Sequence, residues 1–163
     1  MSNAEDVDAR VRRIMRPYED AGLLESGIFA TAANWQALLS NPHAGRVGLV
    51  GFYKSRIPID KNADAGEAIL KLGNDPHYDK VVDDLHVKYG AKHVYFAMSM
   101  CVWVDTDEVD WDFFSISEFP NREAMVGFMM EPAWIEVCKT RVRVLERHRT
   151  YAVRLPDSGM FLH

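Results

Sequence analysis

The stretch from residue 111 to residue 135 constrains the fold most strongly, because it changes from a strand pattern to a helix pattern within a few residues. Aromatic and β-branched residues fill much of positions 111–119 and favour the half-buried surface of a sheet. Pro120 cannot donate a hydrogen bond to a neighbouring strand, so the strand is predicted to end there. Asn121 is predicted to cap the following helix, and Glu123 complements the positive end of the helix dipole.

The rest of the chain predicts three more strands and three helical segments. Apolar residues at strand spacing predict strands at 46–55, 92–104 and 147–155. Apolar residues at helical spacing predict helices at 6–24, 31–39, 64–89 (interrupted at 73–76) and, after the corner, about 122–145. Thr31 is predicted to cap the second of these helices. Pro17 is predicted to kink or end the first one, because proline lacks the backbone donor.

The predicted elements of residues 45–156 follow one another as β-α-β-β-α-β, which is the succession of a ferredoxin-like split βαβ unit. The expected fold class is therefore α+β, with residues 1–44 as an N-terminal helical extension and residues 157–163 as a C-terminal tail. Two helices cover only one face of a four-stranded sheet, yet strand 92–104 is largely apolar on both faces. A second copy stacked on the uncovered face would bury it, so we expect a homodimer whose two sheets form an α/β barrel.

Charge and hydropathy limit the range of partners. The 24 acidic residues outnumber the 19 lysines and arginines, and the net charge of −5 disfavours a nucleic-acid partner. No apolar run approaches the roughly 18 residues that span a bilayer, and the N-terminus lacks the pattern of a signal peptide. We therefore expect a cytoplasmic protein without a membrane partner. Cys101 and Cys138 are isolated and are expected to be reduced, buried side chains.

Short motifs between residues 78 and 151 carry a resemblance to a known group of proteins. They are Tyr78, Gly90-Ala91, Glu118-Phe119-Pro120, Glu123-Ala124, Pro132-Ala133-Trp134 and Arg141. In these motifs the chain resembles a small family of unknown function within the dimeric α/β-barrel superfamily. Trp134 stands where that family usually has tyrosine, which removes a hydroxyl. The resemblance implies a ferredoxin-like dimer. The wider superfamily includes cofactor-free monooxygenases, haem-degrading enzymes, isomerases and cyclases, and the fold alone does not choose among them.

The second and third predicted strands carry the first candidate site. His93 and Tyr95 are expected on one face of strand 92–104. If Ser115 and Ser117 oppose them on the next strand, a polar pocket forms beneath the helices. His93 would then act as a base near neutral pH, with Tyr95 orienting a carbonyl or phenolic oxygen. In the alternative interpretation, His93 is solvated at the start of its strand and Tyr95 is a core aromatic residue.

Glu118 is the third candidate catalytic residue. A carboxylate at a strand end beside an apolar pocket would have a raised pKa and would serve as a general acid or base. The alternative is an ion pair with Arg141 or Arg149 that fixes the strand–helix corner. Either arrangement would perturb the pKa of the carboxyl group, so the sequence leaves both open.

Four arginines between residues 141 and 149 surround His148 in the sequence. The planar guanidinium group binds a carboxylate through two parallel hydrogen bonds, so this cluster could hold a substrate carboxylate. Arg141 and His148, together with Ser115 and Ser117, are the expected substrate-binding residues. In the alternative interpretation, most of the cluster is a solvated helix end that the helix dipole favours.

No motif indicates a metal or a nucleotide. The histidines show no HxxxH or HxH spacing, and the acidic segment 105–112 lacks the glycine of a calcium loop. Glycine-rich phosphate loops and GxSxG are absent as well. We therefore expect neither a metal nor a cofactor.

The leading expectation is a protein that binds a small, partly apolar molecule between sheet and helices. If it is an enzyme, cofactor-free proton transfer or oxygenation of a carbonyl or phenolic compound is the expected chemistry. A non-catalytic interaction module and a haem-binding protein are the alternatives, because all three need the same core and the same dimer.

Overall fold

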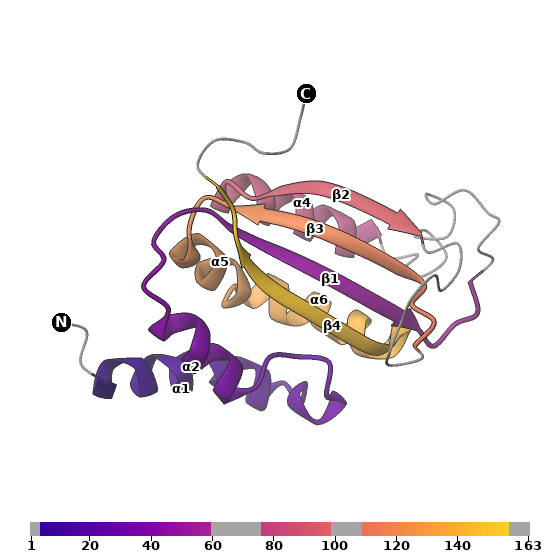
Figure 1. The fold of residues 1–163 in the computed structure, drawn as a ribbon. Coiled ribbons are helices and arrows are strands. Elements are labelled where there is room, and N and C mark those ends of the chain that lie inside the picture. The colour runs from indigo at the N-terminus through magenta and orange to yellow at the C-terminus, as the bar shows by residue number, and fades with distance from the viewer. Residues whose placement is uncertain (1–3, 60–75, 99–108, 157–163) are drawn as a thin grey trace.

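The computed structural model describes residues 4–59, 76–98 and 109–156, which form an α+β fold around a four-stranded antiparallel sheet (Figure 1). The strands lie in the order β2-β3-β1-β4, with the first and third strands at the centre of the sheet. Their bounds are β1 (Val47–Ser55), β2 (Lys92–Met98), β3 (Phe113–Phe119) and β4 (Leu145–Arg154). This order is the one expected of a split βαβ unit.

The helices lie on one side of the sheet (Figure 1). The helix α4 (Pro76–Tyr89) precedes β2, while α5 (Arg122–Met129) and α6 (Pro132–Val144) join β3 to β4. Ahead of β1, α1 (Ala4–Asp20) and α2 (Ala32–Ser40) pack on each other, with a 3-10 turn at Leu24–Ser26 between them, and α1 contacts α6. The predicted start of helix 64–89, the predicted strand residues beyond 98, the acidic segment up to residue 108 and the tail lie outside the described residues.

The strand–helix corner forms as predicted and then differs in one respect. Asn121 caps α5, because its side-chain oxygen accepts a hydrogen bond from the backbone N–H of Ala124 (2.8 Å). The single helix predicted for residues 122–145 is wrong, since the helix is interrupted between Met129 and Pro132. Proline lacks a backbone donor, its ring crowds the preceding turn, and the residue before it takes an extended backbone. A new helix therefore starts at Pro132.

The N-terminal helices also follow local rules. Thr31 caps α2 as predicted: its hydroxyl accepts from the backbone N–H of Asn34 (3.3 Å), and the Asn34 side chain accepts from the backbone N–H of Thr31 (2.9 Å). Pro17 lies inside α1, which ends at Asp20 instead of at residue 24. The helix thus stops within one turn of the proline.

One hydrophobic core joins the N-terminal helices to the helices that cover the sheet. Ile14 of α1 and Cys138 of α6 are both fully buried, and Cys138 is a free thiol as predicted. Tyr18 donates a hydrogen bond to the carbonyl oxygen of Met129 (2.7 Å) and accepts one from the indole N–H of Trp134 (3.1 Å). These bonds hold α1 at the junction of α5 and α6.

The sheet face that points away from the helices carries a group of aromatic side chains. The ring of Phe52 lies 6.1 Å from that of Trp111, 6.2 Å from Phe114 and 6.5 Å from Tyr151, measured between centres. Tyr151 remains 51% exposed. We call this surface the outer face and define it by Val50, Phe52, Trp111, Phe114, Ile116 and Tyr151.

Candidate functional site

A cavity of about 730 Å³ lies between the sheet and the helices. All four strands and the helices α1, α2, α4, α5 and α6 contribute residues to its lining. The volume falls within the range of small-molecule sites. Much of the lining is apolar and includes Leu49, Phe119, Met125, Phe128, Met129 and Trp134.

Three parallel rings from neighbouring strands form part of the site. Tyr53 of β1 stacks between Phe113 of β3 and His148 of β4, with ring centres 4.7 Å apart in both pairs, because it pairs with both residues across the sheet. Gly51 leaves room for this ring, since a Cβ there would collide with the hydroxyl end of Tyr53. The ring therefore lies along the sheet, and its hydroxyl shares a hydrogen bond of 3.1 Å with Ser115.

Arg141 of α6 brings a positive charge into the cavity. Its guanidinium carbon lies 5.5 Å from the ring centre of Tyr53 and 5.4 Å from that of Trp134, within the range of cation–π contacts. Its Nη1 donates to the hydroxyl oxygen of Tyr78 on α4 (3.2 Å). Among the described residues, no carboxylate lies within ion-pair distance of it. Arginine stays protonated in proteins, so this charge persists at all relevant pH values.

His148 is held in its neutral form. Its Nδ1 lies 2.9 Å from the carbonyl oxygen of Ile28, which can only accept, so we assign the proton to Nδ1. Nε2 then accepts a hydrogen bond from the Thr150 hydroxyl (2.5 Å). Burial, followed by the charge of Arg141, lowers the pKa of His148 to about 3. At neutral pH the ring is an acceptor without charge.

Two further histidines meet at the β2 side of the cavity. The rings of His86 and His93 lie 4.3 Å apart and nearly perpendicular. Burial, followed by the neighbouring His93, lowers the pKa of His86 to about 4, and desolvation lowers the pKa of His93. Nδ1 of His93 lies 3.2 Å from the hydroxyl oxygen of Ser117. Both rings are therefore neutral at pH 7 and able to accept a proton.

Acidification is predicted to destabilise the fold. Unfolding returns His148 from a pKa of about 3 to its ordinary value of 6.5. Between these values the unfolded chain binds one more proton, so the free energy of unfolding falls as the pH drops from about 6.5 toward 3. The slope is at most about 1.4 kcal/mol per pH unit for this residue, and above pH 6.5 it contributes none. Urea unfolding at about pH 7, 6 and 5 should show the decrease. It should be smaller in His148→Gln, and an identical decrease in that variant would contradict the prediction.

The segment between α1 and α2, with α2 itself, forms one wall of the cavity. Its lining residues include Ile28, Phe29, Thr31, Trp35 and Leu38. The carbonyl oxygen of Ile28 accepts the His148 hydrogen bond, and the ring of Phe29 lies 5.5 Å from that of Tyr18. Sequence reasoning did not anticipate this role, because contacts between residues more than a hundred positions apart leave no local pattern.

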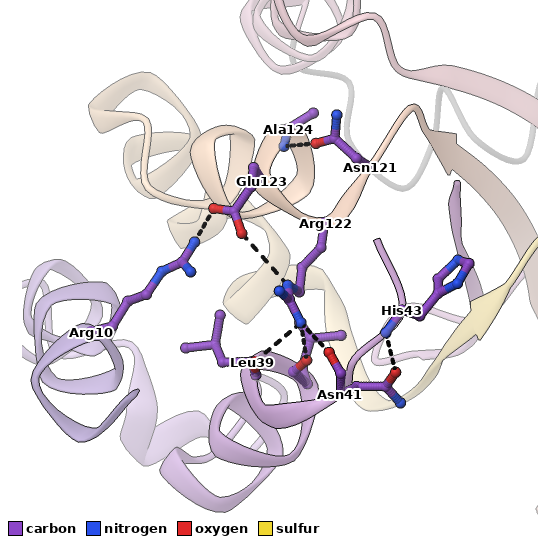
Figure 2. A network of polar contacts seen from close by, with 9 residues as sticks. Arg10, Leu39, Asn41, His43, Asn121, Arg122, Glu123 and Ala124 are labelled. Carbon is purple, nitrogen blue, oxygen red and sulfur yellow. Dashed lines mark hydrogen bonds and ion pairs between the residues drawn. The ribbon is translucent and has the colours of Figure 1, made fainter. Parts of the chain in front are cut away.

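Arg122 fastens the end of this wall to α5 (Figure 2). Its Nη1 donates to three carbonyl oxygens at the C-terminal end of α2, those of Leu38 (3.2 Å), Leu39 (3.1 Å) and Asn41 (2.5 Å). The last carbonyls of a helix lack intrahelical donors, so this guanidinium satisfies them. Glu123 lies 3.6 Å from Nε of Arg122 and forms an ion pair with Arg10 of α1. Both N-terminal helices are thus tied to the start of α5.

The structure brings together five of the predicted site residues. They are His93, Ser115, Ser117, Arg141 and His148, and all of them line the cavity. Glu118 does not belong to this group: neighbouring residues of a strand point to opposite faces, and its carboxylate pairs with Arg46 (2.8 Å to Nε). Arg46 therefore takes the place that the alternative interpretation gave to Arg141 or Arg149.

The expected arrangement of His93 and Tyr95 also differs. His93 pairs with Ser117, but Tyr95 pairs with Ile116, because the register shifts between His93 and Tyr95. Such a bulge places two residues of one strand opposite one of its partner, so the simple alternation of faces is interrupted there. The side chain of Tyr95 lies outside the described part of the chain.

Sequence reasoning assigned no role at the site to Tyr53, Tyr78 or His86, which all line the cavity. A signal existed for two of them, since Tyr78, Val82 and His86 follow at intervals of four residues and therefore share one face of α4. For Tyr53 the signal is weaker. Its place in the cavity follows only from the strand pairing, in which Tyr53 lies between Phe113 of β3 and His148 of β4.

Within the described ranges, no group of three or more His, Cys, Asp or Glu side chains is placed to hold a metal ion. None of the described helices is both long and apolar enough to cross a bilayer. The polar side chains that line the cavity are the arginine, the neutral imidazoles and the hydroxyls described above, together with the amides of Asn34 and Asn41.

No protein-family model matches the sequence, and no curated protein matches it either. The fold is similar to that of a protein of unknown function from Rhodopseudomonas palustris, with a TM-score of 0.63 and 18% identity over 80% of this chain and 97% of the other. The methylated form of that protein gives a TM-score of 0.63 and 18% identity over 81% and 96%. A dimeric protein of unknown function and ferredoxin-like fold from Bacteroides fragilis is more distant, with a TM-score of 0.44 and 17% identity over 68% and 97%. At 18% identity, the similarity to the first protein shows a shared fold and nothing about function.

Proposed function

We propose that this protein binds a small, partly apolar molecule in the cavity between its sheet and its helices. The observation that carries the proposal is a cavity of about 730 Å³ with largely apolar walls and a few convergent polar groups. The aromatic rings of Phe128 and Trp134 and the thioether of Met129 favour a ligand whose main part is apolar. Arg141 and the hydrogen-bonded Tyr53–Ser115 pair supply orientation.

Filling the cavity from the sheet is predicted to weaken ligand binding. Ser117 lines the cavity and pairs with Leu49 and His93 across the sheet. A phenyl ring there would occupy the space of a ligand, so Ser117→Phe should weaken binding of the neutral fluorescent probe N-phenyl-1-naphthylamine by about tenfold or more. Ser40→Phe, the same exchange at the exposed end of α2, should bind the probe as the wild type does. Equal affinity in all three proteins would place the probe elsewhere and contradict the proposal.

We further propose that the cavity supports cofactor-free chemistry on a carbonyl or phenolic compound, with His93 as the base. A neutral imidazole accepts a proton from the carbon next to a carbonyl or from a phenolic hydroxyl. Negative charge then develops on the oxygen, where hydroxyl groups of the cavity such as those of Tyr53 and Ser115 would stabilise it by donating hydrogen bonds. In the oxygenation variant of this reaction, dioxygen is the co-reactant.

Hydrogen–deuterium exchange at the methyl ketone of 1-acetonaphthone in heavy water tests this chemistry. The wild type should accelerate the exchange, and His93→Gln should remove the acceleration while leaving probe affinity unchanged. A wild type without acceleration would favour the non-catalytic alternative. A Soret band after mixing with haem would favour the haem-binding alternative, for which His86, His93 and His148 are the histidines that line the cavity.

We also propose that the outer face pairs with a second copy of the chain. Its rings are only partly buried in one copy, and a sheet face of this kind is self-complementary across a two-fold axis. Sedimentation should therefore detect a dimer in the wild type and in Phe114→Leu. Phe114→Glu should be monomeric, because the two copies would bring carboxylates into an apolar interface. A monomeric wild type at micromolar concentration would contradict the proposal.

A further inference from the structure

Arg141 differs from other cations of this fold in its surroundings. Several basic side chains have acidic partners: Arg46 with Glu118, Lys54 with Asp112, and Lys88 with Glu131. The guanidinium of Arg141 instead contacts the hydroxyl of Tyr78 and the faces of two aromatic rings. None of these neighbours carries a formal negative charge at neutral pH, so within the described part of the chain the guanidinium has no counter-ion.

The rest of the lining reinforces this imbalance. Among the described residues, the cavity lining contains no aspartate, glutamate or lysine, and Arg141 is its charged side chain. The three histidines are neutral at pH 7, because burial and neighbouring groups lower their pKa values. The described lining therefore carries a net positive charge, which favours an anion and disfavours an amine.

The groups around Arg141 also suit one kind of anion. A guanidinium fork donates two parallel hydrogen bonds to a carboxylate, and an arginine stacked on aromatic rings keeps its edge available for such bonds. Arg141 can bind one acidic group of a ligand. The rest of the ligand would then contact apolar side chains such as Phe119, Phe128 and Met125. An apolar body with a single acidic group matches this division of the cavity.

We propose that the natural ligand is an apolar monocarboxylate, aromatic or aliphatic, whose carboxylate is bound by Arg141. The inference rests on the proposed function, since it assigns a charge to the molecule that the cavity holds. The apolar body lies against the aromatic and methionine side chains. The Tyr78 hydroxyl supports the guanidinium from the side of α4.

Two probes of the same shape, one charged and one neutral, distinguish recognition of the ligand's charge from binding in the cavity as such. Calorimetric titration compares 1-naphthoate with the neutral 1-naphthamide in the wild type, in Arg141→Met and in the control Arg143→Met, which removes an exposed arginine on the same helix. The wild type and the control should bind naphthoate about 10-fold to 100-fold more tightly than naphthamide. In Arg141→Met this preference should disappear, while naphthamide affinity stays within about threefold, because methionine retains the apolar stem of the side chain.

The possible outcomes separate the two proposals. Equal affinity of both probes for the wild type would overturn the carboxylate inference and leave the cavity as a binding site. A preference that survives in Arg141→Met would overturn the role of Arg141. Binding of neither probe would count against the proposed function and against this inference with it. If Arg141→Met fails to fold, the comparison of the two probes in the wild type still decides the charge of the preferred ligand.

Discussion

Replacing Phe128 by alanine is expected to lower the free energy of unfolding by about 3–5 kcal/mol. Phe128 is 2% exposed, and its ring centre lies 5.1 Å from that of Trp134 and 5.5 Å from that of Phe119. It also contacts the rings of His86 and Tyr89 on α4. Truncation therefore removes contacts among α4, α5, α6 and the sheet at once, and the vacated volume joins the cavity.

Urea unfolding at one fixed protein concentration measures the effect, because the proposed dimer would make stability depend on concentration. Val87→Ala is the matched control, since Val87 is 84% exposed on α4 and its truncation should change the free energy of unfolding by less than about 0.5 kcal/mol. A loss below about 1 kcal/mol in Phe128→Ala would mean that the helices are not held together by this cluster.

Replacing Arg122 by methionine is expected to destabilise the packing of α2 on the rest of the fold by about 2–3 kcal/mol. The reason is that three carbonyl oxygens at the end of α2 lose a charged donor. The loss should be local, since these hydrogen bonds hold the C-terminal end of α2, while the packing of α2 on α1 remains. Trp35 and Leu39 are the buried residues of this helix. The wall of the cavity that α2 provides should then open more often, so bound 1-naphthoate should dissociate faster.

Amide hydrogen exchange measured on peptides that cover residues 31–41 tests this expectation. Exchange there should be faster in Arg122→Met than in the wild type, with little change in the central strands β1 and β3. Arg12→Met, which removes an exposed arginine of α1, is the control and should exchange like the wild type. Unchanged protection in Arg122→Met would show that the hydrogen bonds to α2 are dispensable.

Elements whose signals are local were predictable from the sequence. The strand before Pro120, the cap at Asn121 and the cap at Thr31 each depend on residues within a few positions of one another. The order of the strands followed from the succession of elements, because few topologies are compatible with β-α-β-β-α-β. The break at Pro132 also had a local signal, the proline itself, but the continuous apolar stripe of residues 122–145 led to the prediction of one helix.

The candidate site was predictable only in part, because it depends on register and on long-range contacts. Ser115, Ser117 and His93 come together through strand pairing, which the sequence suggested. The bulge between His93 and Tyr95 was not predictable, because no proline or glycine lies between these two residues in the sequence. The pairing of Glu118 with Arg46 joins residues 72 positions apart, and many arginines could have served as its partner.

The N-terminal helices show the same limit more clearly. Their amphipathic pattern predicted a helical extension, but not which surface it covers. In the structure they share the core with α5 and α6 and close one side of the cavity. In the proposed function, residues 4–44 would thus have a role that their own sequence does not reveal.

The most direct test of a carboxylate-binding cavity between sheet and helices is a crystal structure of the full chain soaked with 1-naphthoate. We expect the naphthyl ring in the cavity, against Phe119 and Phe128, with the carboxylate on the guanidinium of Arg141. A cavity closed by the protein's own side chains, with naphthoate absent or bound on the outer face, would contradict it.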